Sequence, residues 1–296
     1  MPQLSFRFGT VGSPLSTPKK PGGSVGGIQR LAELDLLGLE LGWVRAVRVS
    51  ENSCSEIRAT GQVQNVAISV HAPYYINLNA DEVEWPKSRQ RLMDAAHYGN
   101  LAGATDIVFH PGSYFEQAPD HVLSIAIPRL AGCIADLHAV GNTVNLRPET
   151  MGKSAMLGSL EDTIIMSQEI ESIQPCLDFA HLHARTGDGS MNSYSDWARI
   201  LEFYGKSLGD ESLKHLHIHL SGIAYGPKGE KEHLPLQESD LNLIAILRAL
   251  KDFKCQGRIL CESPILEDDA LICKQTWEDI SQENYGTAGM LLNEPG

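Results

Sequence analysis

The sequence of 296 residues lacks the features that define secreted, disulfide-rich and membrane proteins. Its six cysteines form no CxxC pair and no disulfide-framework spacing, so we expect buried, reduced thiols. No signal peptide is evident, and no apolar run looks long enough to span a bilayer. These absences predict a cytoplasmic protein with no membrane partner.

Positively charged residues are also scarce, with 24 Lys and Arg against 37 Asp and Glu, which gives a formal net charge of −13. This balance argues against a general nucleic-acid coat protein. It does not exclude a local groove that binds phosphate through metal ions, because a bound cation can dominate the field of its own site.

The chain has no internal repeat, low-complexity tract or long linker, so we expect a single domain over residues 1–296. The expected strands cover residues 4–10, 38–44, 66–71, 106–110, 143–149, 175–179, 213–220 and 257–262. The expected helices cover residues 25–37, 86–101, 121–140, 160–172, 195–204 and 239–251. This alternation indicates parallel strands, and eight such units predict an α/β fold, the (β/α)8 TIM barrel. A doubly wound open sheet is the alternative, but no GxGxxG turn opens a helix.

Residues 213–221 contain three histidines in alternation with apolar residues. Period-two spacing is typical of a strand, so His215, His217 and His219 are expected to share one face. They could be hydrogen-bonded core residues, but other strand-like runs also end on residues that bind metals, which favours a ligand role for His219.

Six consecutive expected strands end on imidazole or carboxylate side chains. In chain order these residues are His71, His110, Glu149, Asp178, His219 and Glu262. In a TIM barrel the carboxyl ends of the strands form one rim, where active sites lie. Four such ligands suffice for one zinc ion, so the set predicts at least two metals. Imidazole and carboxylate without thiolate suit Zn2+, with Mn2+ or Fe2+ as alternatives.

The motifs around these residues resemble the endonuclease IV family of apurinic/apyrimidinic endonucleases. The similar runs are His71-Ala-Pro-Tyr-Tyr-Ile-Asn-Leu78, His110-Pro-Gly-Ser113, Pro148-Glu149-Thr150, Asp178-Phe-Ala-His181, His219-Leu and Cys261-Glu262-Ser, in the family's order. The resemblance implies a (β/α)8 barrel whose trinuclear zinc cluster hydrolyses the phosphodiester 5′ to an abasic site. The expected partner is therefore DNA that contains abasic sites, and we expect a monomer.

The resemblance also implies roles for individual residues. His71 and His110 would hold one zinc, and Asp178, His219 and Glu262 a second. Glu149 would bridge these two ions, which makes it the candidate catalytic residue. His181 and His233 would belong to a third zinc, and Tyr74 would enter the DNA at the lesion.

The third metal site departs from the family pattern. The family has an Asp-x-His pair there, but Lys231 occupies the aspartate position, so Glu230 or Glu232 is expected to serve instead. If the loop is extended, Glu230 and Glu232 would point together, opposite to Lys231.

The candidate substrate-binding residues are basic. Arg45 or Arg48 would probe the lesion, and Arg147 would neutralise a phosphate or orient Glu149. Phosphate contacts are also expected from Arg185, Lys228 and Lys231.

Two other functions remain open. Xylose-isomerase-like sugar isomerases and epimerases collect Glu, Asp, His and Glu at strand ends, and the acidic net charge favours a small sugar substrate. His71 and His110 favour the endonuclease, because they are surplus to a mononuclear site. A non-catalytic, metal-binding sensor of DNA damage is the third possibility. No GxSxG motif indicates a serine hydrolase.

Overall fold

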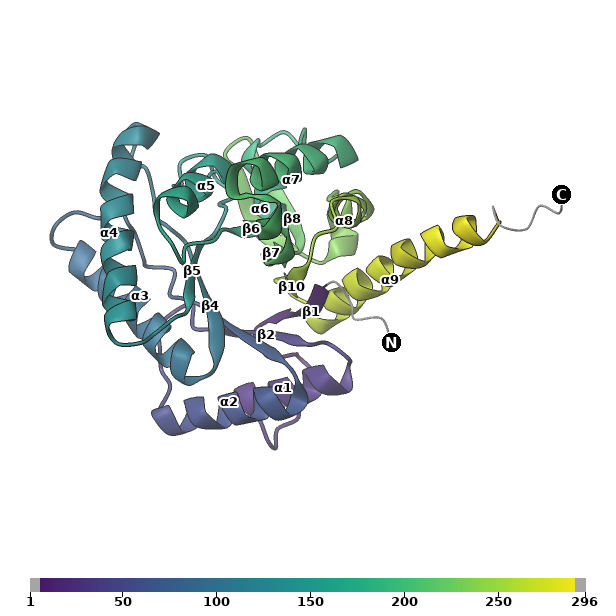
Figure 1. Ribbon diagram of the computed structural model, residues 1–296, viewed down its shortest axis with the longest axis horizontal. Coiled ribbons are helices and arrows are strands. Elements are labelled where there is room, and N and C mark those ends of the chain that lie inside the picture. The colour runs from purple at the N-terminus through teal and green to yellow at the C-terminus, as the bar shows by residue number, and fades with distance from the viewer. Residues whose placement is uncertain (1–5, 291–296) are drawn as a thin grey trace.

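The computed structural model describes residues 6–290, and its centre is a ring of eight parallel strands (Figure 1). These strands are β1 (Phe6–Val11), β2 (Gly38–Gly42), β3 (Ala67–His71), β4 (Ala104–Phe109), β5 (Asn145–Pro148), β6 (Cys176–Asp178), β7 (Leu216–Leu220) and β10 (Gly257–Cys261). The sheet has the order β5-β4-β3-β2-β1-β10-β7-β6. Parallel bridges of Leu146 with Ile173 and of Glu149 with Cys176 join its two ends. The predicted TIM barrel is confirmed.

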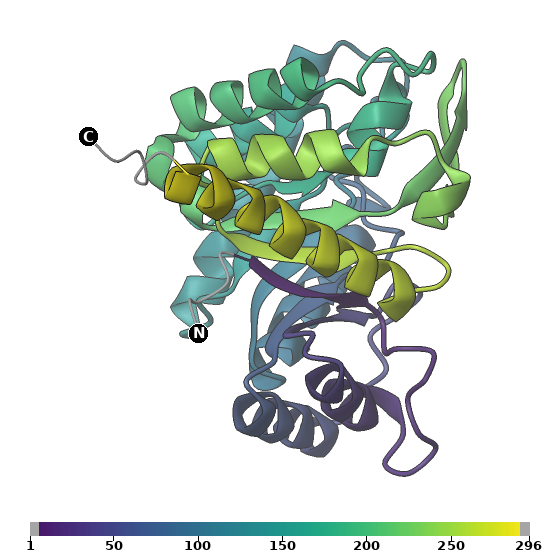
Figure 2. The same cartoon turned by 90° about the vertical axis from the view of Figure 1, so that its right-hand side faces the viewer.

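Helices cover the outside of the ring, as Figures 1 and 2 show. They are α1 (Gly23–Glu33), α2 (Glu51–Gln64), α3 (Trp85–Leu101), α4 (Pro119–Ala139), α5 (Leu160–Glu169), α6 (Phe179–Arg185), α7 (Tyr194–Leu208), α8 (Leu243–Asp252) and α9 (Glu267–Met290). Capping boxes begin α5 and α7, where Ser159 and Ser193 accept hydrogen bonds from the backbone N–H groups of Asp162 and Asp196. Helices α2, α6 and α9 were not predicted from the sequence.

Helix α4 is long and apolar enough, by composition, to cross a membrane, with a mean hydropathy of 1.4 over 18 residues. This corrects the expectation that no apolar run reaches that length. A helix that covers a protein core passes the same test, and α4 packs against α3 and α5. Its side chains Val122 and Leu130 are fully buried, so its apolar composition follows from that packing.

The histidine-rich segment differs from its expected form at its amino end. A 3-10 turn covers Asp210–Lys214, and β7 begins only at Leu216. The alternation therefore turns His217 and His219 into the barrel, where both are fully buried. The expectation was wrong for His215, whose side chain is 61% exposed and lies 3.7 Å from Glu211.

An antiparallel hairpin follows β7, and the sequence did not predict it. It consists of β8 (Gly222–Gly226) and β9 (Gly229–Leu234) and forms the light-green projection at the right-hand edge of Figure 2. Glu230 pairs with Tyr225 and Glu232 pairs with Ala224, so Lys231 is an extra residue in a β-bulge. The bulge breaks the simple alternation that would point Glu230 and Glu232 to the same side.

Arg147 lies near the amino-terminal ends of the strands rather than at the predicted rim. Its Nε donates to Asp106 Oδ1 at 2.5 Å, and its remaining N–H groups donate to Gln174, Pro175 and His215. Only 4% of Arg147 is exposed. The structure thus contradicts a phosphate contact or an orienting contact to Glu149, because these partners hold the guanidinium at the base of the barrel.

Asp106 is shared by the buried Arg147 and by Arg258, whose side chain is 15% exposed and lies 2.9 Å from the second carboxylate oxygen. We expect Asp106→Ala to lower the free energy of unfolding by about 3–5 kcal/mol, because it leaves the buried guanidinium of Arg147 without its carboxylate. The matched control is Asp136→Ala, which removes the surface partner of Arg89 and should cost about 0–1 kcal/mol. Chemical denaturation measures both values, and equal losses would contradict the prediction.

Candidate metal centre

The carboxylate of Glu149 occupies the middle of the carboxyl-terminal rim and is fully buried. Its Oε2 lies 3.2 Å from Nε2 of both His71 and His110. Its Oε1 lies 3.3 Å from Nδ1 of both His181 and His219. The barrel thus brings four imidazoles from four different segments around one carboxylate.

The predicted ligands gather into three overlapping groups, in each of which the ligand atoms lie within 4.8 Å of one another. The groups are His71, His110 and Glu149; Glu149, Asp178, His219 and Glu262; and Asp178, His181 and His233. Glu149 belongs to the first two, as the resemblance implied. Asp178 belongs to the last two, so it can also serve the third site, a role that the sequence did not indicate.

Buried polar atoms at this rim lack hydrogen-bond partners. Among the described residues, neither Asp178 Oδ2 nor His181 Nε2 has one. An unsatisfied buried carboxylate oxygen or ring nitrogen is costly, and a divalent cation would satisfy both. The donor set of imidazole and carboxylate also suits zinc, manganese or iron(II), so the residues fit the metals that the family resemblance implies.

In the metal-free protein, protons on the histidines balance the negative charge of the buried carboxylates. Burial would lower the pKa of His71, but the adjacent Glu149 raises it to about 9. Burial alone would likewise raise the pKa of Glu149, but the imidazoles of His219 and His110 hold it well below its usual range. Burial raises the pKa of Asp178 to about 6. The centre therefore carries imidazolium protons at neutral pH that metal ions would displace.

The third group includes His233 of the bulged strand β9, and Glu230 of the same strand lies beside that group. Glu230 Oε2 lies 3.6 Å from His181 Nε2, and the Glu230 side chain is 19% exposed. Glu232 and Lys231 are exposed. Of the two candidate glutamates, the structure therefore places Glu230 beside the third group, and Lys231 belongs to none of the ligand groups.

Gly152 allows Glu230 to approach His181, because it has no side chain between them. A Cβ at position 152 would lie 2.7 Å from the Cβ of Glu230 and 3.1 Å from the ring of His181. The Glu230 backbone N–H donates to Gly152 O at 2.9 Å, which fixes β9 beside the loop that follows Glu149.

Tyr74 lies on the outer side of the ligands and is 50% exposed. Its ring stacks on His110 with centroids 4.9 Å apart, and it meets His71 edge-on at 5.3 Å. The loop after β2 holds its backbone, because the Tyr74 N–H donates to Val44 O. Arg45 and Arg48 belong to that same exposed loop. These residues are thus placed at the surface beside the centre, where a large substrate could reach them.

Arg185 has a different placement from the one expected. It donates to the backbone carbonyls of Met151, Lys153 and Met156, at 2.9, 2.6 and 3.2 Å. The guanidinium therefore fixes the loop between Glu149 and α5, and it supports the ligands instead of facing a phosphate. Lys228 is exposed at the tip of the hairpin.

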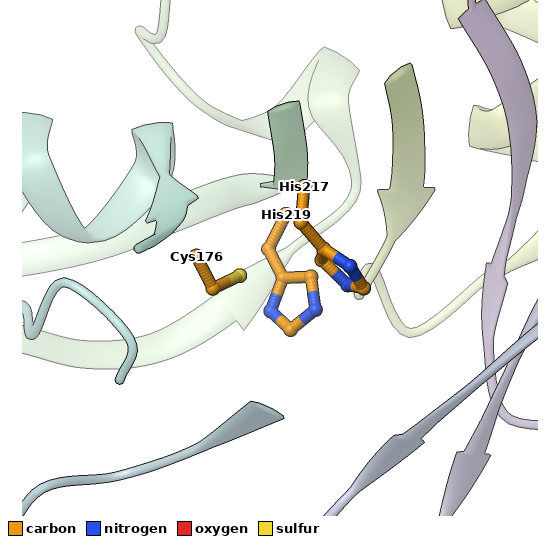
Figure 3. A group of neighbouring side chains, drawn as sticks. All are labelled: Cys176, His217 and His219. Carbon is orange, nitrogen blue, oxygen red and sulfur yellow. The ribbon is translucent and has the colours of Figure 1, made fainter. Parts of the chain in front are cut away.

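One buried residue beneath the rim was missed. Glu40, in the middle of β2, contacts both His217 and His219, and it belongs to no motif of the resemblance. Figure 3 shows His217 and His219 projecting from β7 beside Cys176. The only signal in the sequence was an isolated charge between Leu39 and Leu41, inside an otherwise apolar strand.

Comparisons with known proteins identify the family. The model of the xylose isomerase-like TIM barrel family matches residues 28–284. The chain belongs to this family.

Among its relatives, an uncharacterised protein of Methanocaldococcus jannaschii is 37% identical over 279 residues, which covers 94% of this chain and 99% of that protein. A probable endonuclease 4 of Mycoplasma pneumoniae is 32% identical over 185 residues, covering 60% of this chain and 61% of that protein.

Two similar solved structures share the fold of this chain but carry the names of different enzymes. Endonuclease IV from Thermus thermophilus superposes with a TM-score of 0.67 at 20% identity, covering 93% of this chain and 99% of that one. A D-tagatose 3-epimerase-like protein superposes with a TM-score of 0.66 at 18% identity, covering 88% and 97%. At these identities the likeness shows the fold alone, so the function has to be argued from the site.

The first prediction from this centre concerns the third ligand group. We expect Glu230→Gln to weaken the metal position bounded by His181 and His233, because a neutral amide is a poorer ligand than a carboxylate. The matched control is Glu232→Gln, because Glu232 is an exposed residue of the same strand. This substitution should leave the occupancy of the third metal position unchanged. Anomalous scattering at the zinc edge, from crystals grown with zinc, measures each position. A third peak of equal strength in both variants would contradict this assignment.

The second prediction concerns pH. The pKa of an unfolded histidine is about 6.5, whereas the contact with Glu149 outweighs the effect of burial and raises the pKa of His71 to about 9 in the folded, metal-free protein. Protonation of His71 therefore stabilises the fold fully below about pH 6.5, and this contribution is lost as the pH rises through about 9. We expect the Tm of chelator-treated protein to fall across this window. The Tm of zinc-loaded protein should not fall in parallel, because zinc binds the neutral ring. Identical pH profiles would contradict the prediction.

Proposed function

We propose that this protein is a metal-dependent phosphodiesterase of DNA repair, similar to endonuclease IV, that cleaves DNA on the 5′ side of abasic sites. One observation carries the proposal: the group of His71, His110 and Glu149 adjoins the group of Glu149, Asp178, His219 and Glu262. The second group has enough ligands for one metal by itself. The first adds two imidazoles that a mononuclear enzyme does not need.

The chemistry of phosphodiester hydrolysis suits such a centre. Divalent ions, most simply zinc, would supply an activated water nucleophile and neutralise charge on the phosphate group. The protein's own contribution is to hold the ligands rigidly: Glu149 is fixed by four imidazoles, and Arg185 fixes the loop that follows it. Tyr74, Arg45 and Lys231 lie on the exposed surface around the centre, in positions where they could contact DNA.

A sugar isomerase or epimerase is the second candidate. The group of Glu149, Asp178, His219 and Glu262 would suffice for one metal, and the net charge of −13 is compatible with a small, uncharged substrate. The structural likeness to a D-tagatose 3-epimerase-like protein is nearly as strong as that to endonuclease IV. Under either proposal we place the protein in the cytoplasm as a monomer.

A direct assay separates the two functions. A duplex oligonucleotide with a single abasic analogue is incubated with metal-loaded enzyme, with chelator-treated enzyme and with Glu149→Gln. We expect cleavage by the first alone, with a loss of at least about 100-fold in the variant, because Glu149 is shared by two ligand groups. Ketohexoses are offered in parallel, and epimerised sugar with intact DNA would overturn the proposal.

A further prediction concerns Tyr74. An exposed aromatic ring beside a catalytic centre can stack on or wedge beside an unpaired base. Tyr74→Ala should therefore weaken binding of abasic duplex by about 1–3 kcal/mol, with metal content and Tm nearly unchanged. The neighbouring Tyr75, which is 65% exposed, provides the control Tyr75→Ala. A large fall in Tm with unaltered DNA binding would instead assign Tyr74 to packing.

A further inference from the structure

Glu40 is a carboxylate in the interior of the barrel. It lies in the middle of β2, between the buried residues Leu39 and Leu41, and is 0% exposed. An isolated buried carboxylate is costly unless hydrogen-bonded or charged partners surround it. Its partners therefore indicate why an apolar strand carries an acidic residue at this position.

Both oxygens of Glu40 lie close to polar atoms of other strands. Oε2 accepts a hydrogen bond from Ser69 Oγ at 2.8 Å and lies 2.8 Å from His217 Nε2. Oε1 lies 3.0 Å from His219 Nε2 in an ion-pair contact without hydrogen-bond geometry, and among the described residues neither of these two atoms has a hydrogen-bond partner. Ser69 is on the neighbouring β3, whereas His217 and His219 are on β7, which is not adjacent to β2 in the barrel. Glu40 thus connects two separated strands through the interior.

His219 links Glu40 to the candidate metal centre. One ring nitrogen, Nε2, faces Glu40. The other, Nδ1, faces Glu149 Oε1 at 3.3 Å and Glu262 Oε1 at 3.4 Å, which are members of its ligand group. Histidines that bind metals usually donate their second N–H to a carboxylate or carbonyl, which fixes the tautomer and the plane of the ring.

We propose that Glu40 is a positioning residue of the metal centre: in the metal-loaded protein it accepts the Nε2–H of His219, across the present 3.0 Å contact, and so presents Nδ1 of that ring to a divalent cation. The inference rests on the proposed metal centre but not on the DNA substrate. It assigns the ligand atom of His219, and it makes β2 a contributor to a centre whose other residues come from later strands.

Glu40 could instead bind a metal directly, since its oxygens lie within 4.8 Å of ligand atoms of His71 and Glu262. The contacts favour positioning, because Ser69 and His217 hold one oxygen and His219 faces the other. The two roles differ in a measurable way. Loss of a ligand lowers the number of metals bound at saturation, whereas loss of a positioning contact lowers affinity at an unchanged number.

The test compares Glu40→Gln with Ser69→Ala, using zinc and a competing chromophoric chelator. We expect Glu40→Gln to lower the affinity of the tightest site about 10–100-fold, with the same number of zinc ions at saturation. Ser69→Ala removes the hydrogen bond to Glu40 Oε2 and leaves the contact between Oε1 and His219. The zinc affinity of this variant should therefore change much less. No change in Glu40→Gln, one ion fewer at saturation, or an equal fall in both variants would each overturn the inference.

A measurement on the unaltered protein guards against misfolding of the variants. Long-range 1H–15N spectra of zinc-loaded protein, with His219 assigned by its absence in His219→Gln, should place the ring proton on Nε2. A proton on Nδ1 would overturn the inference. Neither measurement uses DNA. The role of Glu40 can therefore be confirmed or overturned even if the protein does not cleave abasic DNA.

Discussion

The whole centre depends on the contacts between the buried carboxylate of Glu149 and the four imidazoles around it. Glu149 is fully buried, and four ring nitrogens lie within 3.3 Å of its two oxygens. Such a carboxylate is stable only where positive charge faces both of its oxygens. Parallel strands meet this requirement, because their carboxyl ends converge on one rim and each can contribute a side chain. The barrel thus supplies the geometry, and the strand ends supply the charge.

Much of the fold and the grouping of most candidate ligands could be predicted from the sequence. The alternation of strands and helices determines the barrel, and residues such as His71 and Glu262 could be located because strand ends must lie on the same rim. The interior contacts could not be predicted in this way. Glu40 follows no motif, and its role depends on His219 from a strand that is not its neighbour.

The errors have identifiable physical causes. Arg147 alternates in register with Glu149, but its long side chain reaches the base of the barrel, where Asp106 pairs with it. The spacing of residues along a strand predicts on which face of the strand a side chain lies. It does not predict toward which end of the barrel a long, flexible side chain extends. Glu230 and Glu232 were expected to point together, and a one-residue bulge at Lys231 separates them. A bulge depends on the partner strand, which the sequence did not reveal.

The hairpin of β8 and β9 has a consequence for how the number of metals can change. It lies outside the eight-stranded ring, yet it provides His233 to the third ligand group and brings Glu230 to within 3.6 Å of His181 in that group. The first two groups come from the barrel's own strand ends. A change in the hairpin can therefore alter the third group while the barrel keeps the first two, so a segment outside the ring decides how many of the candidate ligand groups are complete.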